Sequence, residues 1–300
     1  MSFLLKAPKL THFHSTPAML LCLSTLSLSS SSSSSVSSPL CLNSPCPSQS
    51  NPVYIKFRTS YRQNLRYLRA LGLLDPKAKP HEIPSRESVD LLISRVHFFT
   101  SKGFAGSDLP RIAFLCPQLF SPGFNLDETE SVFEFLAADV SASARDSCGL
   151  ITKHPQILLS DVEYCLRPTL DYLRQLGVGR LNAPTTLNAH LLNTRVERLR
   201  EKVKFLRSVG LTYEESATIC ARLPALFGYS VEENLRPKYE YLVEEMERSL
   251  EELKRFPQYF GFSLRKRIAP RHLHLTQLNV RLPLNRMLMW SDERFYAKWR

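Results

Sequence analysis

The chain has 300 residues, a hydrophobic content of 43% and a formal net charge of +11. This hydrophobic content is enough for a folded core, which excludes disorder throughout the chain. No stretch reaches about 18 uninterrupted apolar residues, so no membrane span is expected. The positive charge indicates an anionic partner or a need for solubility, and charge alone does not choose between them.

The first 50 residues form a serine-rich leader. They contain 16 serines, with an unbroken run from Ser29 to Ser35, and no acidic residue occurs before Asp75. This composition is typical of an organelle transit peptide, and it cannot bury enough apolar surface to fold. Because no arginine precedes Arg58, a chloroplast address is favoured and a mitochondrial one is the alternative. We predict a disordered transit peptide over residues 1–50, with its cleavage site undefined.

Residues 51–104 are expected to form an N-terminal helical segment with degenerate repeats. Five positive charges and no negative one occur in residues 51–74, and a proline-containing connector follows up to Pro84. Apolar residues then return at helical spacing from Ser88, and Gly103 suits a left-handed cap at the end of that helix.

A motif returns along the rest of the chain at intervals of 33 to 38 residues. It consists of a proline, two residues and then Phe or Leu, and it begins at Pro117, Pro155, Pro224 and Pro257. Such a period is typical of stacked helical repeats, in which no unit buries its apolar face alone. Asn188 occupies the expected proline position of a third, degenerate copy, so we number the copies 1 to 5.

Each copy is predicted to hold two helices. A short helix ends at the proline, which lacks an amide donor and clashes with the preceding turn. A longer helix follows, with apolar residues 11, 15 and 18 positions after the proline position. Ser160 and Ser230 begin capping-box patterns that would place Pro168 and Pro237 inside this helix and bend it. The alternative places each proline in the first helical turn.

These motifs resemble those of the mitochondrial transcription termination factor (MTERF) family, and its plant, plastid-targeted members above all. The Pro-x-Leu-Phe ending of one helix, a Leu-Arg-Pro step and a Leu-Gly close carry the resemblance, which covers residues 105–300. The matching segments are 116–120, 166–168, 223–227, 235–237 and 256–260. The resemblance implies an all-α superhelical solenoid of MTERF-type helical repeats, whose basic concave side grips nucleic acid.

We therefore expect four parts: the transit peptide, the segment 51–104, an MTERF-like helical-repeat solenoid over 105–280 and a basic C-terminal cap or tail over 281–300. The number of repeats stays open. The resemblance implies a nucleic-acid-binding regulator of plastid gene expression, with double-stranded DNA favoured and a role in transcription termination or regulation. Two alternatives are an RNA-binding factor for plastid RNA processing or splicing, and a non-catalytic protein-binding α-solenoid.

The resemblance brings no cofactor and no catalytic residue, so an enzyme is not expected. His272 and His274 are the only close histidine pair outside the leader, and packing explains them better than a metal site. We expect a monomer that binds nucleic acid and no membrane, with the organelle transcription machinery as a further candidate partner. Outside the leader the cysteines are far apart and are expected to pack as small apolar residues. They are Cys116, Cys148, Cys165 and Cys220.

Charge is banded along the repeats. Residues 127–163 and 230–252 are acidic, whereas residues 164–210 hold nine bases against three acids. Residues 253–300 hold eleven bases and two acids, so few of these charges can be neutralised within the band. A phosphate backbone is a natural counter-charge, although a solvated helix face would also explain any single cation. The predicted contacts are Arg265, Lys266, Arg267, Arg271, Arg281 and Arg286 first, and Arg200, Lys204 and Arg207 second.

Overall fold

The structure is a computed structural model that describes residues 60–300, and the expectations for the leader and for residues 51–59 lie outside this range. Within it the regular elements are all helices, which confirms the all-α fold class. None of these helices is both long and apolar enough to cross a membrane. The α-helices are α1 (Tyr61–Ala70), α2 (Arg86–Ser101), α3 (Leu109–Leu115), α4 (Glu130–Ala138), α5 (Ala144–Lys153), α6 (Arg167–Gln175), α7 (Thr186–Leu192), α8 (Val196–Ser208), α9 (Tyr213–Arg222), α10 (Arg236–Glu240), α11 (Leu250–Arg255), α12 (Ala269–Gln277), α13 (Leu284–Met289) and α14 (Asp292–Lys298).

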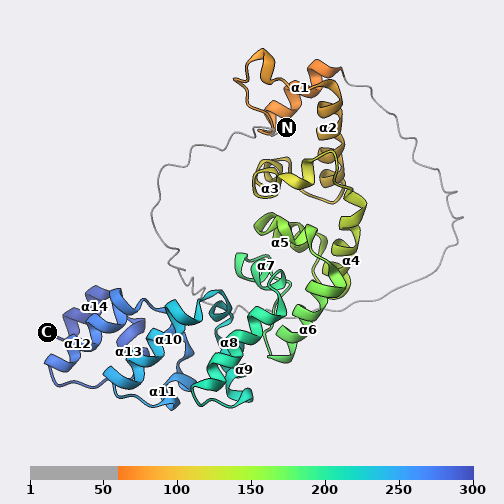
Figure 1. Ribbon diagram of the computed structural model, residues 1–300. Helices are drawn as coiled ribbons and strands as arrows, with labels where there is room; N and C mark the ends of the chain where they lie inside the picture. The colour runs from red at the N-terminus through yellow and green to blue at the C-terminus, as the bar shows by residue number, and fades with distance from the viewer. Residues whose placement is uncertain (1–59) are drawn as a thin grey trace, which may run out of the picture.

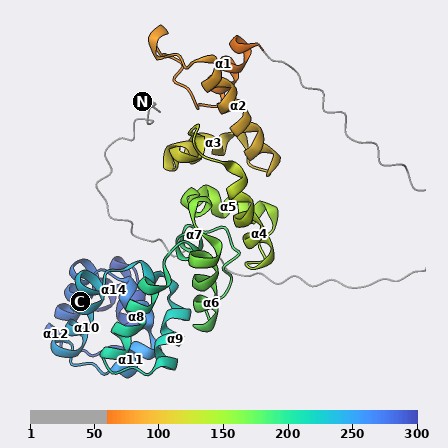
Figure 2. The same cartoon turned by 45° about the vertical axis from the view of Figure 1, so that its right-hand side comes forward.

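Each copy of the motif forms a unit of two α-helices. Unit 1 holds α3 and α4, unit 2 holds α5 and α6, unit 3 holds α7 and α8, unit 4 holds α9 and α10, and unit 5 holds α11 and α12. Figure 1 shows α3, α5 and α7 in one column with α4 and α6 along its side, and in the turned view of Figure 2 α6 lies below α7. The array then turns toward α8–α14, so α1 and α14 lie at opposite ends (Figure 1). Because α5 packs on α7 and α6 on α8, neighbouring units bury each other's faces, as in a solenoid.

The predicted apolar stripe of the second helix lies in the core. Its members are buried in units 2, 3 and 4, except for Tyr239, which is half-buried. The buried members are Leu166, Leu170, Leu173, Leu199, Val203, Leu206, Leu235 and Leu242. The repeat period of the sequence therefore predicted correctly which face of the second helix is buried.

The motif prolines end the first helices as predicted. Each proline begins a 3₁₀ turn: Pro117–Phe120, Pro155–Leu159, Pro224–Gly228 and Pro257–Gly261. The preceding residue leaves the helical conformation in every case, as at Leu223, with φ −136° and ψ 70°. The α region is disfavoured before proline because the pyrrolidine ring clashes with the preceding residue.

A second set of prolines combines the two predicted alternatives: the helix begins at its capping residue with a π-helical turn, and each proline lies in the first turn of the α-helical part that follows. In unit 2 a π-helical turn, Val162–Leu166, runs directly into α6, and the Arg167 amide bonds to the Val162 carbonyl five residues back. Pro168 cannot donate to the carbonyl four residues back, and its ring would clash there, so the wider turn accommodates it. The same turn occurs before Pro237 and Pro270, as Val231–Leu235 and Leu264–Ile268. Another π-helical turn, Tyr241–Glu245, has no such proline.

The cap of this helix was predicted correctly in one unit and wrongly in another. Ser230 accepts a hydrogen bond from the Glu233 amide, as its capping pattern predicts. In unit 2 the cap is Asp161, whose carboxylate accepts from the Tyr164 amide. The Ser160 hydroxyl is instead hydrogen-bonded to Asn193, 2.5 Å away. Asp161 competes successfully because it is also a strong capping residue, one position closer to the helix.

The third copy is more degenerate than the sequence suggests. Asn188 does not occupy a proline position; it lies inside α7, and its amide donates to the carbonyl oxygens of Arg180 and Ala183. Only residues 193–195 separate α7 from α8, so the 3₁₀ turn found in the other units is missing. Glu201 stands where unit 2 has Pro168, and α8 has no π-helical turn, which supports the role of proline in that turn.

The tail caps the last unit. α12 packs on α13, and Met287, Leu288 and Phe295 are fully buried. The His274 ring Nε2 lies 2.5 Å from the Trp299 carbonyl oxygen. His272 is likewise occupied, with its Nδ1 3.0 Å from the Tyr241 hydroxyl. Both histidines therefore take part in packing, as expected from the sequence.

The cysteines outside the leader are free thiols. Cys116, Cys148 and Cys220 are buried, and Cys165 is half-buried. Burial raises the pKa of the Cys220 thiol to about 12. Three of the four therefore pack as small apolar residues, as predicted.

Candidate nucleic-acid interface

The three predicted contacts on α8 lie together on its exposed face. Arg200, Lys204 and Arg207 are exposed and follow at helical spacing, while Leu199 and Val203 on the other face are buried. The Arg200 guanidinium carbon lies 5.4 Å from the centroid of the Tyr172 ring on α6. Such a cation–π contact orients the arginine without neutralising its charge. None of the three cations forms an ion pair with another described residue.

A second group of cations lies at the start of the long helix of unit 5. Arg265 and Lys266 are exposed in the π-helical turn Leu264–Ile268. Arg267 is half-buried, 5.6 Å from the Phe262 ring centroid and 3.8 Å from the Asp292 carboxylate. Cations in the first turn of a helix are disfavoured by the helix dipole. This turn therefore holds charges that the stability of the helix does not require.

Arg271 does not belong to this surface. Its side chain is 1% exposed, and the guanidinium donates to the carbonyl oxygens of Met287 and Trp290. It also pairs with Asp292 at 2.5 Å. The sequence placed it among the predicted contacts because it belongs to the same basic band, but its hydrogen-bonding groups point into the fold.

The remaining predicted contacts lie between α12 and α13 and on α13. Arg281 is exposed, and its guanidinium donates to the Glu247 carbonyl oxygen at 3.1 Å. Arg286 is exposed on α13. Both belong to the tail that covers the end of the solenoid.

The structure keeps the α8 set on one helix face, divides the other set between the turn of unit 5, the buried Arg271 and the tail, and separates the two sets. Unit 4 lies between α8 and the basic turn of unit 5. In the repeat register, the positions of Lys204 and Arg207 are occupied in unit 4 by Glu240 and Val243. The two basic sets are therefore two patches rather than one continuous stripe.

Two arginines that occupy the same register position as Arg200 were missed. Arg167 lies 33 residues before it and Arg236 lies 36 residues after it, each directly after a buried leucine. Arg236 lies 5.5 Å from the centroid of Phe205, which is the register equivalent of Tyr172. A comparison of equivalent exposed positions in successive repeats would have found Arg167, Arg200 and Arg236, whereas counting the charges in each segment of the sequence did not.

Carboxylates bind the two missed arginines. Arg236 makes two hydrogen bonds to Glu232, at 2.7 and 3.0 Å. Arg167 makes the same paired contact with Glu163, and it also donates to Asp139 at 2.6 Å. The hydrogen bonds to Glu232 raise the pKa of Arg236, and those from Arg236 lower the pKa of Glu232. Both groups therefore stay charged near neutral pH.

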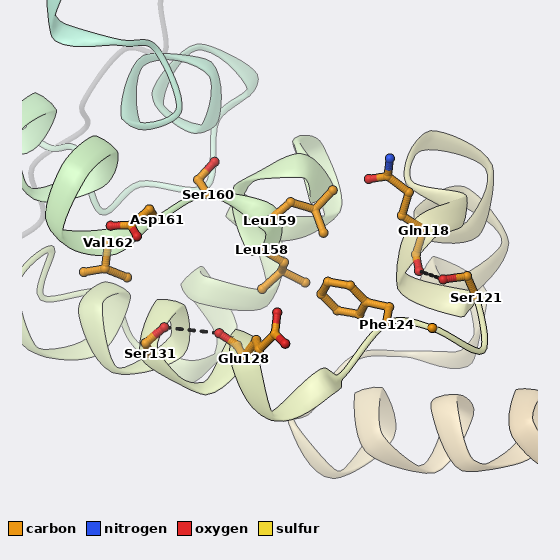
Figure 3. A pocket seen from close by; sticks show the side chains of 11 residues that line it. Gln118, Ser121, Phe124, Glu128, Ser131, Leu158, Leu159, Ser160, Asp161 and Val162 are labelled. Atoms are coloured by element: carbon orange, nitrogen blue, oxygen red, sulfur yellow. Dashed lines mark hydrogen bonds between the residues drawn. The ribbon is translucent and has the colours of Figure 1, made fainter.

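A cavity that lies between units 1 and 2 is unsuited to phosphate. Its volume is about 560 Å³, and Figure 3 shows Glu128 and Asp161 at its wall beside Phe124 and Leu159. A neighbouring cavity of about 400 Å³ adds Glu134, Asp139 and Glu163 to the acidic lining, and Arg167 at its wall is held by two of these carboxylates. Because these carboxylates would repel phosphate, the cavities leave α8 and the turn of unit 5 as the candidate interface.

These features define a class: an all-α solenoid of two-helix units that presents exposed cations on the second helices. Residues 185–296 match the mTERF family model. This match confirms, for this part of the chain, the resemblance to the mTERF family seen in the motifs.

One curated relative is transcription termination factor MTERF8, chloroplastic, from Arabidopsis thaliana. It is 36% identical over 100 residues, which are 32% of this chain and 20% of the relative. The chain therefore spans about a fifth of the length of this relative.

Proposed function

We propose that this chain binds nucleic acid through phosphate contacts and regulates gene expression in an organelle, with double-stranded DNA as the favoured ligand. The observation that carries the proposal is the set Arg200, Lys204 and Arg207, three exposed cations on one helix face to which no carboxylate of residues 60–300 is paired. Arg265 and Lys266, with Arg267 beside them, form a second patch in the last unit. Arg281 and Arg286 are exposed beyond the other end of α12 and remain further candidate contacts, whereas Arg271 is left out because it is buried.

The chemistry of these patches suits the backbone of a nucleic acid rather than its bases. Lysine and arginine neutralise phosphates and release condensed counterions, which gives affinity with a strong salt dependence. Such contacts fix position and carry no direct sequence information. Transcription termination is the finer proposal, and the name of the chloroplastic relative supports it together with a chloroplast location.

Neutralising the α8 set is expected to weaken binding to any duplex. In the triple variant Arg200→Ala, Lys204→Ala and Arg207→Ala, affinity should fall by about tenfold or more at moderate salt, because three phosphate contacts are lost. The plot of log affinity against log salt concentration should flatten by up to about 2.7, at about 0.9 for each contact with B-form DNA. Fluorescence anisotropy with labelled duplex DNA and single-stranded RNA over a salt series measures both quantities.

A matched control removes three other exposed cations. Arg62→Ala, Arg66→Ala and Arg145→Ala change the net charge equally on α1 and α5, away from the proposed patches. The control should retain most of the salt slope of the parent. Equal losses in both triple variants would refute a local interface on α8. Tighter binding of RNA than of duplex DNA would replace the favoured ligand, and no binding of either would favour the protein-binding solenoid.

A further inference from the structure

Arg167, Arg200 and Arg236 form a row along the solenoid: they occupy equivalent positions in units 2, 3 and 4 but have different partners. Among residues 60–300 Arg200 has no carboxylate partner and lies over the Tyr172 ring, because Val196 stands four residues before it, where the other two units have Glu163 and Glu232. In those units the glutamate lies one helical turn before the arginine and binds its guanidinium with both oxygens. Of these three arginines, two are held by carboxylates, and the guanidinium of Arg200 has no carboxylate partner in the described part of the chain.

The spacing of the row is compatible with a nucleic-acid backbone. Packed helices lie about 8–10 Å apart. Phosphates of one DNA strand follow at about 3.4 Å along the duplex axis, so one arginine per unit would meet about every third phosphate. Each arginine also contacts the second helix of the preceding unit, through Asp139, Tyr172 or Phe205, which fixes its place in the row.

We propose that Glu163 and Glu232 act as carboxylate guards, which compete with phosphate for Arg167 and Arg236 and leave Arg200 as the dominant contact of the row. This inference rests on the proposed nucleic-acid binding and adds a control of its strength. Guanidinium groups bind carboxylate and phosphate with the same paired geometry, so the two anions exclude each other at one arginine.

The guards are strong enough to compete and weak enough to be displaced. The side chains of Glu232 and Arg236 are 70% and 44% exposed, so water and salt screen their attraction. Arg167 is held more firmly, because Asp139 binds it in addition to Glu163. Removing a single guard should therefore release Arg236 more completely than Arg167.

The test replaces each guard by its neutral isostere. Glu232→Gln is expected to tighten binding of duplex DNA by about two- to fivefold, in keeping with the modest strength of exposed ion pairs. It should also steepen the salt slope by about 0.9, because one more phosphate is contacted. Glu163→Gln should have a smaller effect because Asp139 remains. The measurement is anisotropy over a salt series, with circular dichroism to show that each variant is folded.

Glu233→Gln is the matched control. It removes the same charge from the neighbouring exposed position, where no arginine is bound. If Glu233→Gln tightens binding as much as Glu232→Gln does, net charge explains the gain and the guard is refuted. A second check is Glu232→Gln combined with Arg236→Ala, which should lose the gain if it acts through Arg236. Persistence of the gain in that background would also refute the guard.

The two levels of the inference fail differently. If the parent binds neither duplex DNA nor RNA, the proposed function fails and the guards fall with it. If the parent binds with a steep salt slope but the glutamine variants match the control, only the guards are refuted. Arg200→Lys adds a positive check, because the dominant contact should weaken when the planar guanidinium is lost although the charge remains.

Discussion

Replacing Arg271 by alanine is expected to destabilise the end of the solenoid by about 3–5 kcal/mol. The buried guanidinium donates to Met287 at 2.6 Å and to Trp290 at 2.8 Å, and it lies 4.5 Å from the centroid of the Phe295 ring. Alanine would leave those carbonyl oxygens without a donor and a cavity beneath α14. Loss of one partner from a buried network is costly because the other partners remain desolvated.

Denaturant unfolding followed by circular dichroism measures this loss, and hydrogen exchange should locate it in α13 and α14. Arg267→Ala is the control, since it removes the same charge from a half-buried side chain four residues away. We expect it to cost less than about 1 kcal/mol. A variant Arg271→Ala as stable as Arg267→Ala would contradict the structural role. Binding experiments on the unit 5 patch should accordingly change Arg265 and Lys266 and leave Arg271 intact.

The repeat register predicted the fold well because burial leaves a periodic trace. Leucines at equivalent positions, such as Leu166, Leu199 and Leu235, are all fully buried. The motif prolines likewise located the ends of the first helices. The missing turn of unit 3 was not predictable from spacing, because the chain between its helices is shorter while the apolar stripe keeps its 33-residue interval.

The candidate site was predicted less well because charge does not indicate the direction of a side chain. Arg271 and Arg265 belong to one basic band, yet one is buried and the other exposed. Comparison of equivalent positions in the repeats does indicate that Arg271 is buried. The positions equivalent to Arg271 are Lys238 in unit 4 and Thr169 in unit 2, and the Thr169 hydroxyl donates to the Thr194 carbonyl oxygen. In units 2, 4 and 5 a polar donor at this position binds a carbonyl oxygen of the following unit or of the tail, whereas Lys202 of unit 3 lies beside Glu201.

The second large effect that we expect is a pH-dependent contribution of Lys238 to the stability of the fold. Its side chain is 5% exposed, and the amine donates to the Asn234 side chain and to the Phe260 carbonyl oxygen, both at 2.7 Å. Burial lowers the pKa of Lys238 from 10.5 to about 8. The nearby Tyr229 ring lies 5.4 Å from the amine, and burial raises the pKa of this phenol. Tyr229 therefore stays neutral where Lys238 titrates.

The direction in which stability changes with pH follows from the number of protons bound by the folded and the unfolded chain. Below pH 8 the amine is charged in both states, so the folded chain carries the full cost of a buried ammonium. Between pH 8 and 10.5 the folded chain has released this proton while the unfolded chain keeps it. Since the unfolded state then binds more protons, the contribution of Lys238 to the free energy of unfolding rises with pH. The rise is at most about 3 kcal/mol, from 1.36 kcal/mol for each pKa unit.

Comparison with Lys238→Met isolates this contribution, because the other titrating groups are common to both chains. Methionine has a similar length and no charge, so its stability should not respond to the titration of position 238. The parent should therefore gain stability relative to Lys238→Met as pH rises from 8 toward 10, measured by denaturant unfolding at each pH. Lys266→Met, at an exposed position, should show no such change. A difference between parent and Lys238→Met that is constant over this range would mean that the buried amine titrates at its ordinary pKa. The hydrogen bonds to Asn234 and Phe260 would then outweigh the cost of burial.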